Sequence, residues 1–300
     1  MKVISYETVD RFLDENKTIL LEREAESQLI LYNALVNQEK STNSSMLFGR
    51  VEDYRCHPVL IFANIHPYNL VIHPVRSSGN SSAAVALSDY ITAMNIEING
   101  INARKEICDA FMKEYWKKKP EYDFSENLAM NIMKLSYLKE IKPAEGKFRN
   151  ASLDDIETVA EWMVEFATDA LGECVLYDDQ VPKANRMIES NRLFVFENPD
   201  GDMVSMAAIA RQLVNGACIN YVYTPDKFRG KGYATANVYY LSKLILDKGN
   251  QFCSLFVDKK NPISNRVYHK IGYEIIEEQY DYRLIRCNSK EQEIEYIAVD

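Results

Sequence analysis

The chain has 300 residues, of which 47% are hydrophobic and 11% aromatic, enough to build one large domain or two ordinary ones. Lys and Arg total 35 against 44 for Asp and Glu, and the resulting net charge of -9 argues against a nucleic-acid partner. No apolar stretch is long enough for a membrane span and the N-terminus has no signal-peptide pattern, so we expect a cytoplasmic protein without a membrane partner.

Neither the cysteines nor the histidines indicate a metal site. The cysteines are scattered and form no Cys-x-x-Cys pair, which favours buried, reduced thiols. His57, His66 and His73 share no helical ligand spacing and have no cluster of carboxylates beside them. We therefore expect no bound metal.

The first half alternates between helical and strand patterns. Apolar residues at helical spacing predict one or two helices between about residues 10 and 36. Strand patterns suggest a meander over 46–51, 59–65 and 70–73. The small polar stretch 77–82 is typical of a turn, and helices are expected at 83–94 and 103–118. A strand over 128–137 could close this half.

Pro and Gly within 143–146 interrupt both periodicities, which predicts two domains, 1–145 and 146–300. After a short strand at 147–151, Ser152 and Asp155 resemble a capping box for a helix reaching residue 171. The remaining expected elements are a helix at 179–189, strands at 192–197, 203–213 and 217–223, a helix ending before Gly249, a strand at 252–257, a helix at 261–271 and a strand at 273–285.

The stretch from Tyr221 to Thr235 turns from a strand into a helix through a glycine loop. Gly230 and Gly232 can adopt positive φ, so the backbone N–H groups there can point together at an anion beside the helix N-terminus. Lys227, Arg229 and Lys231 surround this turn, which suits a ligand with several phosphates. The sequence thus predicts a diphosphate cradle, although a glycine loop can also be a simple turn.

Two common phosphate motifs do not fit this loop. A Walker A motif fails because no Gly-Lys pair is followed by Ser or Thr. A dinucleotide fingerprint fails because Thr235 occupies the position of its third glycine. The pattern that remains is Arg229-x-x-Gly232-x-Ala234.

A second motif follows about thirty residues later, after the next strand. Asn261 and Tyr268 are seven residues apart, two helical turns, so they share one face of a helix that begins at Asn261. Asn261 before Pro262 also fits a helix N-cap. Tyr268 could equally be a core aromatic whose hydroxyl needs a partner.

Together, the two motifs resemble those of the GNAT superfamily of N-acetyltransferases, over roughly residues 147–285. In that family an Arg/Gln-x-x-Gly-x-Gly/Ala loop holds the diphosphate of acetyl-CoA. A later Asn and Tyr, followed by Gly and an aromatic residue, match Asn261, Tyr268, Gly272 and Tyr273. The resemblance implies an α+β fold, with a mostly antiparallel twisted sheet flanked by helices. More weakly, the first half resembles the degenerate, non-catalytic N-terminal domain of a two-domain subgroup, which shapes the substrate cleft.

The resemblance also implies direct transfer of an acetyl group from acetyl-CoA to the primary amine of a small molecule. Tyr268 would protonate the leaving thiolate, and backbone N–H groups near Val222 and Tyr223 would hold the oxyanion. The expected cofactor-binding residues are Val222, Tyr223, Thr224, Arg229, Gly230, Lys231, Gly232, Tyr233, Ala234, Thr235, Asn261, Ser264 and Asn265. The general base stays open among Glu165, Glu173, Asp258 and a water chain.

Two alternatives remain open from the sequence. The chain could be an acyl-CoA-binding sensor or structural module without turnover, or it could acetylate a protein or peptide. We expect a monomer or a homodimer with a small-molecule amine as its partner.

Overall fold

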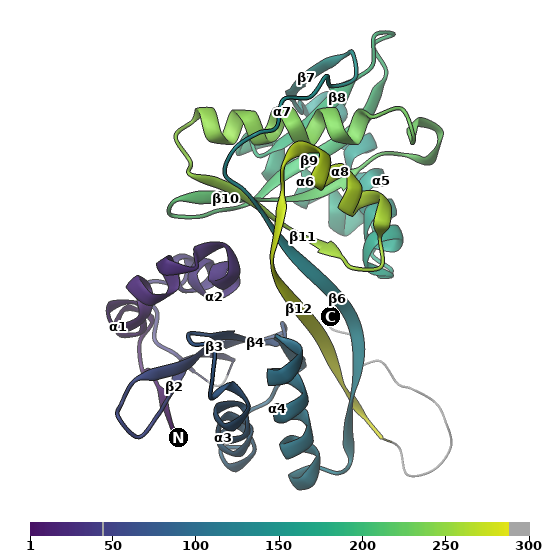
Figure 1. Ribbon diagram of the computed structural model, residues 1–300. Coiled ribbons are helices and arrows are strands. Elements are labelled where there is room, and N and C mark those ends of the chain that lie inside the picture. Colours follow the sequence, from purple (N-terminus) through teal and green to yellow (C-terminus); the bar gives the residue numbers. More distant parts are fainter. Residues whose placement is uncertain (44, 288–300) are drawn as a thin grey trace. The chain divides into compact units, whose positions relative to one another are not determined.

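The computed structural model describes residues 1–43 and 45–287, which form two compact units (Figure 1). Among the described residues, the first unit comprises Met1–Met130 and 277–287, and the second comprises Asn131–Ile276. These limits differ from the expected division into 1–145 and 146–300. The reason is that two long strands, β6 (Tyr122–Leu135) and β12 (Glu274–Arg286), each contribute residues to both units.

The first unit is a sheet with helices on both faces. Its strands lie in the order β1-β2-β3-β4-β5-β12. β4 and β5 run parallel, whereas the pairs β1–β2, β2–β3, β3–β4 and β5–β12 are antiparallel. The strands β1 to β5 are Lys2–Ser5, Met46–Glu52, Pro58–Ile65, Leu70–Pro74 and Gly100–Ala103. The helices α1 to α4 are Val9–Glu22, Glu24–Val36, Asn80–Ala93 and Lys105–Lys118. Along β3, Leu60 and Phe62 pack on the α3 and α4 side, and Ile61 and Ala63 on the α1 and α2 side.

The second unit has the same construction. Its strands lie in the order β7-β8-β9-β10-β11, and β10 and β11 are the parallel pair. The strands β7 to β11 are Lys147–Asn150, Leu193–Glu197, Met203–Gln212, Gly216–Tyr223 and Phe252–Asp258. The helices α5 to α8 are Ile156–Phe166, Tyr177–Glu189, Tyr233–Asp247 and Pro262–Ile271. Residues of α7 and α8 form one core cluster with the sheet, and residues of α5 and α6 form another.

The two halves of the chain therefore repeat one order of elements. Each half runs through a strand, two helices, three strands, a helix, a strand, a helix and a final strand. The final strands are exchanged, because β12 lies beside β5 and β6 lies beside β11. This exchange explains why the compact units do not separate at the Pro and Gly residues near position 145.

The predicted α+β fold is confirmed, with a few local differences. The short strands β1 and β5 were not expected. Helix α3 begins at Asn80, because Gly79 adopts φ 84° and serves as its N-cap, so the expected turn over 77–82 is half helix. The helix expected to reach residue 171 ends at Phe166 and continues as a π-helical turn, Ala167–Leu171. The capping box of Ser152 and Asp155 is present.

No helix within residues 1–43 and 45–287 combines the length and the apolar character that a membrane span needs.

Candidate functional site

The parallel strands β10 and β11 pair over only part of their length. Their register runs from Gly216 opposite Phe252 to Cys218 opposite Ser254, and both strands continue beyond these residues. On its other side, β10 shifts register against β9 between Asn220 and Tyr223, and Tyr221 there has φ 53°. Such a bulge takes backbone groups out of the hydrogen-bonded ladder. The expected oxyanion donors, at Val222 and Tyr223, thus follow a bulge at the end of a strand.

The glycine loop joins this strand end to α7. Gly230 and Gly232 have φ 79° and 84°, as their expected role requires, and Gly232 is the N-cap of α7. No side chain caps this helix, and the N–H of Ala236 donates to the carbonyl of Gly232 at 3.0 Å. The N–H groups of Tyr233, Ala234 and Thr235 precede that bond, so they lie in the first turn, where helical N–H groups have no intrahelical acceptor.

The expected cations occupy two kinds of position around the loop. Lys227 and Lys231 are exposed, with their ammonium groups 4.9 and 5.8 Å from the ring centre of Phe228. Arg229 instead binds protein groups. Its Nε donates to the Thr224 carbonyl at 2.9 Å, and its guanidinium pairs with Asp169 at 2.7 Å and with Asp226 at 2.5 Å. Arg229 thereby ties the loop to the end of β10 and to the π-helical turn.

A buried polar network that the sequence did not reveal lies beneath the start of α7. Asn237 donates to Ser205 Oγ at 3.3 Å, and Ser205 donates to the Tyr223 carbonyl at 3.0 Å. Asn237 Oδ1 and Thr224 Oγ1 are buried without a hydrogen-bond partner among the described residues. The position of Asn237, beside Val238 on the apolar side of a predicted helix, is a signal that could have identified it.

Helix α8 carries the second motif, and its asparagines have structural roles. Asn261 Oδ1 accepts from the Ser264 N–H at 3.0 Å, which confirms the N-cap, and Pro262 is the first helical residue. Asn265 Nδ2 donates to the carbonyls of Asp258 and Asn261 at 2.9 and 2.7 Å, and its Oδ1 accepts from Asn131 at 3.2 Å. The Asn265 amide uses both its nitrogen and its oxygen in these bonds, whereas the side-chain bond of Asn261 to Ser264 uses only its oxygen.

Tyr268 lies on the buried side of α8. Its side chain is 7% exposed, and its ring meets Tyr273 edge-on, with 5.9 Å between the ring centres. The Tyr273 hydroxyl is fixed by a 2.8 Å hydrogen bond with Ser242. Burial raises the pKa of Tyr268, so its hydroxyl is protonated at neutral pH. A general acid must hold its proton before the reaction, and Tyr268 meets that condition.

The three carboxylates considered as bases differ in their surroundings. Glu165 is exposed on α5, and its carboxylate is close enough to the Tyr223 hydroxyl to affect the pKa of Tyr223. Burial, followed by that carboxylate, raises the pKa of Tyr223. Asp258 is the last residue of β11, and its Oδ1 accepts from the Lys260 N–H at 2.8 Å; Glu173 follows the π-helical turn. Glu165 is thus the candidate close to the end of β10.

Within residues 1–43 and 45–287, no group of three or more His, Cys, Asp or Glu side chains is placed to hold a metal ion.

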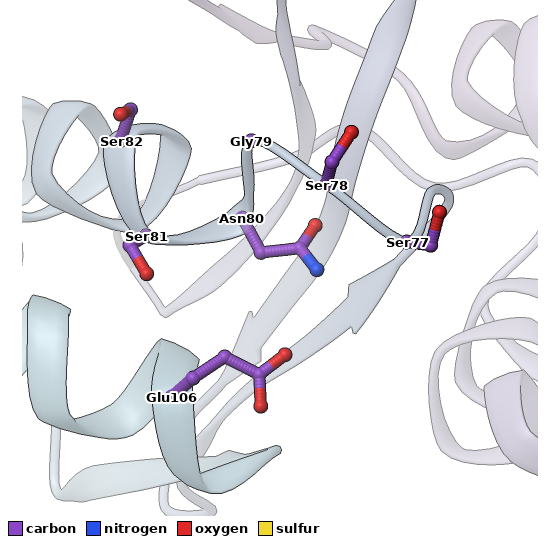
Figure 2. A pocket seen from close by; sticks show the side chains of 7 residues that line it. All are labelled: Ser77, Ser78, Gly79, Asn80, Ser81, Ser82 and Glu106. Carbon is purple, nitrogen blue, oxygen red and sulfur yellow. The ribbon is translucent and has the colours of Figure 1, made fainter.

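A hollow of about 260 Å³ lies in the first unit, at the start of α3 (Figure 2). Its lining comprises Ser77, Ser78, Gly79, Asn80, Ser81, Ser82 and Glu106. None of the predicted site residues belongs to it. The loop nevertheless repeats the spacing of the second unit, as Arg76-x-x-Gly79-x-Ser81 against Arg229-x-x-Gly232-x-Ala234. The small polar residues of this stretch made it resemble an ordinary turn.

Comparison with known proteins identifies a family segment within the second half of the chain. The family model described as FR47-like protein matches residues 199–282, the segment from the turn before β9 into β12. No curated protein gave a significant match.

Several solved structures share the fold of nearly the whole chain. The GCN5-related N-acetyltransferase from Sphaerobacter thermophilus is 13% identical and has a TM-score of 0.59, covering 95% of this chain and 96% of its own. A GNAT-family acetyltransferase from Colwellia psychrerythraea is 11% identical with a TM-score of 0.52, covering 94% and 99%. The GCN5-related N-acetyltransferase from Kribbella flavida is 13% identical with a TM-score of 0.51, covering 87% and 94%.

These findings confirm the fold and the resemblance that the Arg229 and Asn261 motifs predicted. Residues 199–282 carry the FR47-like, GNAT-related family segment, and the chain as a whole has the fold of the GNAT acetyltransferases.

Proposed function

We propose that the second unit binds acetyl-CoA and transfers its acetyl group to the primary amine of a small molecule. Acetyl transfer from acetyl-CoA is general among GNAT acetyltransferases. The observation that carries the proposal is that α7, whose N-terminus has no side-chain cap, follows the bulged end of β10. The open N–H groups of α7 follow β10 through the short loop 224–232, and β10 is no longer paired with β11 at that end.

The loop suits a diphosphate. First-turn N–H groups of α7 would donate to phosphate oxygens, and the helix dipole favours negative charge at the same place. Lys227 and Lys231 would add charge from the exposed side of the loop. Arg229 contributes indirectly, because its bonds to Thr224 and Asp169 hold the loop in position. Positioning of this kind accounts for much of the rate in an acyl transfer.

The reaction that fits the site is direct aminolysis of the thioester. The neutral amine attacks the carbonyl carbon, so a C–N bond forms while the C–S bond breaks. The amine nitrogen loses a proton, and the sulfur leaves as a thiolate that gains one. Backbone N–H groups after the β10 bulge would stabilise the oxyanion, and Tyr268 would supply the proton to the sulfur. The raised pKa of Tyr268 keeps the proton on its hydroxyl until the thiolate forms.

The acceptor side is proposed to lie at the end of α5. Glu165 influences the pKa of Tyr223 beside the bulge, and Asp169 stands in the π-helical turn, where it pairs with Arg229. Carboxylates in this position attract a protonated amine, and Glu165 would accept its proton. Short π-helical turns are frequent at functional sites, which agrees with an acceptor-binding role for Ala167–Leu171.

An amine panel tests the proposal. The protein is mixed with acetyl-CoA and each of a set of small primary amines, and release of the free thiol is followed against an amine-free control. We expect turnover with at least one small amine. Calorimetry with acetyl-CoA is run in parallel, since tight binding without turnover on any acceptor would instead support a CoA-binding module. Turnover on peptide amines alone would support protein acetylation.

A further inference from the structure

The hollow at the start of α3 lies outside the residues that the acetyl transfer uses. It is formed by the loop after β4 and by the first turn of α4, which carries Glu106. Figure 2 shows the Asn80 amide and the Glu106 carboxyl group extending on the same side of the first turn of α3. The hollow therefore brings hydrogen-bond donors and acceptors together.

Its donor side is the N-terminus of α3. Gly79 is the N-cap and has no side chain that could accept a hydrogen bond from the helix. The N–H of Ala83 donates to the Gly79 carbonyl at 3.1 Å, so the N–H groups of Asn80, Ser81 and Ser82 precede the first intrahelical bond. Groups in that position favour a negatively charged ligand. The serine hydroxyls of the lining can donate as well.

Its acceptor side is the Asn80 amide with Glu106. Asn80 is only 5% exposed, and its Nδ2 donates to the Arg76 carbonyl at 3.2 Å. That bond leaves Oδ1 as a buried acceptor that has no partner among the described residues. Buried acceptors are rarely left unpaired, because the lost hydration is not replaced. Asn80 Oδ1 therefore indicates a missing hydrogen-bond donor in the lining of the hollow.

The charges around the hollow distinguish a phosphate ligand from a ligand that carries both a carboxylate and an ammonium group. Arg76, the cation of this loop, is held by Asp53 at 2.8 Å, and it is not part of the lining. A phosphate or diphosphate would bring two or more negative charges close to Glu106, with no lining cation to offset them. A ligand with one carboxylate and one ammonium group instead satisfies both sides of the hollow.

We propose that the hollow at the start of α3 binds a free α-amino acid. Its carboxylate accepts from the first-turn N–H groups of α3, and its ammonium group donates to the Glu106 carboxylate and to Asn80 Oδ1. The site lies within the first unit and needs neither acetyl-CoA nor turnover. Its failure would therefore leave the proposed acetyl transfer untouched.

The test is thermal unfolding and calorimetry of the full chain, without acetyl-CoA, in the presence of each common L-amino acid at about 10 mM. We expect saturable binding of at least one amino acid. The α-hydroxy acid and the decarboxylated amine of the same compound should not bind, because each lacks one of the two charged groups. Glu106→Gln should weaken binding roughly 10- to 100-fold by removing a charge-assisted hydrogen bond.

Glu114→Gln is the matched control on the same helix, where Glu114 pairs with Lys117 outside the hollow. It should bind like the unaltered protein, and the melting temperatures without ligand show whether both variants are folded. The proposal is overturned if no amino acid binds, or if binding is equal in the Glu106 and Glu114 variants. It is also overturned if pyrophosphate binds and Glu106→Gln tightens it, since the hollow would then be an anion cradle.

Discussion

The loops before α3 and α7 share a backbone and differ in chemistry. Gly79 and Gly232 are both N-caps with φ 84°, and each stands three residues after an arginine. Around Gly232 the exposed lysines at 227 and 231 accumulate positive charge. Around Gly79, Arg76 is neutralised by Asp53, and Glu106 joins the lining. One backbone arrangement can therefore offer two kinds of helix start, and the side chains around it select the ligand.

The strands that lead into these loops differ as well. β4 pairs with β3 from Leu60 opposite Pro74 to Ala63 opposite Val71 without a register shift, whereas β10 has a bulge at Tyr221. The later helices also differ. Tyr268 is the seventh residue of α8 counted from Pro262, and the seventh residue of α4 counted from Lys105 is the buried Phe111. The bulge and the hydroxyl group to which we assign roles in acyl transfer are thus features of the second unit.

The largest effect on activity should come from removing the Tyr268 hydroxyl, because Phe111, at the same position of α4, has no hydroxyl group. We predict that Tyr268→Phe lowers kcat roughly 100- to 10,000-fold, the range for losing a general acid. The affinity for acetyl-CoA should hardly change, because the ring stays in place. Steady-state kinetics and calorimetry measure the two quantities. Tyr273→Phe is the control, since it removes a buried hydroxyl bonded to Ser242 and should cost stability but little of kcat. An unchanged kcat in Tyr268→Phe would remove Tyr268 as the acid.

The two N-cap glycines provide the next comparison. An added Cβ would lie 3.8 Å from Ala144 at Gly232 and 3.6 Å from Val59 at Gly79, so neither substitution causes a clash. Both Gly→Ala variants should lose about 1–2 kcal/mol of stability from their positive φ. Only Gly232→Ala should weaken acetyl-CoA binding, by roughly tenfold. Chemical denaturation and calorimetry test this pair, and equal loss of acetyl-CoA affinity in both variants would contradict separate roles for the loops.

The arginines of the two loops should show a smaller difference. Arg229→Ala removes the hydrogen bond to the Thr224 carbonyl and the pairing with Asp169, which hold the loop. We expect acetyl-CoA to bind roughly fivefold more weakly, as for the loss of one ordinary hydrogen bond. Arg76→Ala should leave that affinity unchanged. A wild-type dissociation constant for Arg229→Ala would exclude this arginine from the cradle.

The smallest effect concerns Asp53, which neutralises Arg76. The His57 N–H and the Arg76 guanidinium lower the pKa of Asp53 to about 2 from 3.8, against the opposing effect of desolvation. A lowered folded-state pKa stabilises the fold above the unfolded value, and that contribution is lost as pH falls from about 4 towards 2. We predict that Asp53→Asn is slightly less stable at neutral pH, and that the difference shrinks over this window. Urea denaturation at several pH values measures it, and a pH-independent difference would rule out the linkage.

Local patterns made most of the fold predictable. The apolar spacing of α5 and α7, the capping box of Ser152 and Asp155 and the N-cap at Asn261 are short-range signals, and the structure contains each of these features. The four-residue strands β1 and β5 were missed because they are too short to show alternation. The strand exchange could not be predicted, since the pairing of β5 with β12 joins residues nearly 180 positions apart and has no local signature.

The candidate site was predictable in its backbone and less so in its side chains. The glycines at 230 and 232 predicted the positive φ found there, and a glycine N-cap also leaves the first N–H groups of α7 without a side-chain acceptor. The direction of Arg229 depends on Asp169, which lies sixty residues earlier in the chain, and no spacing rule connects the two. The contact of Ser205 with Asn237 likewise depends on the packing of α7 onto β9. Tertiary contacts of this kind decide which polar groups remain free for a ligand.

The exchanged strands also determine when each sheet can be completed during synthesis. β5 finds its antiparallel partner only in Tyr280–Arg283, so a nascent chain that stops near residue 145 presents an open strand edge. The first unit is therefore finished last, after nearly all of the second unit has left the ribosome. If the chain were cut between its two halves, β5 would lose its partner β12 and β11 would lose its neighbour β6. We expect either half alone to associate through these open strand edges rather than persist as a soluble domain.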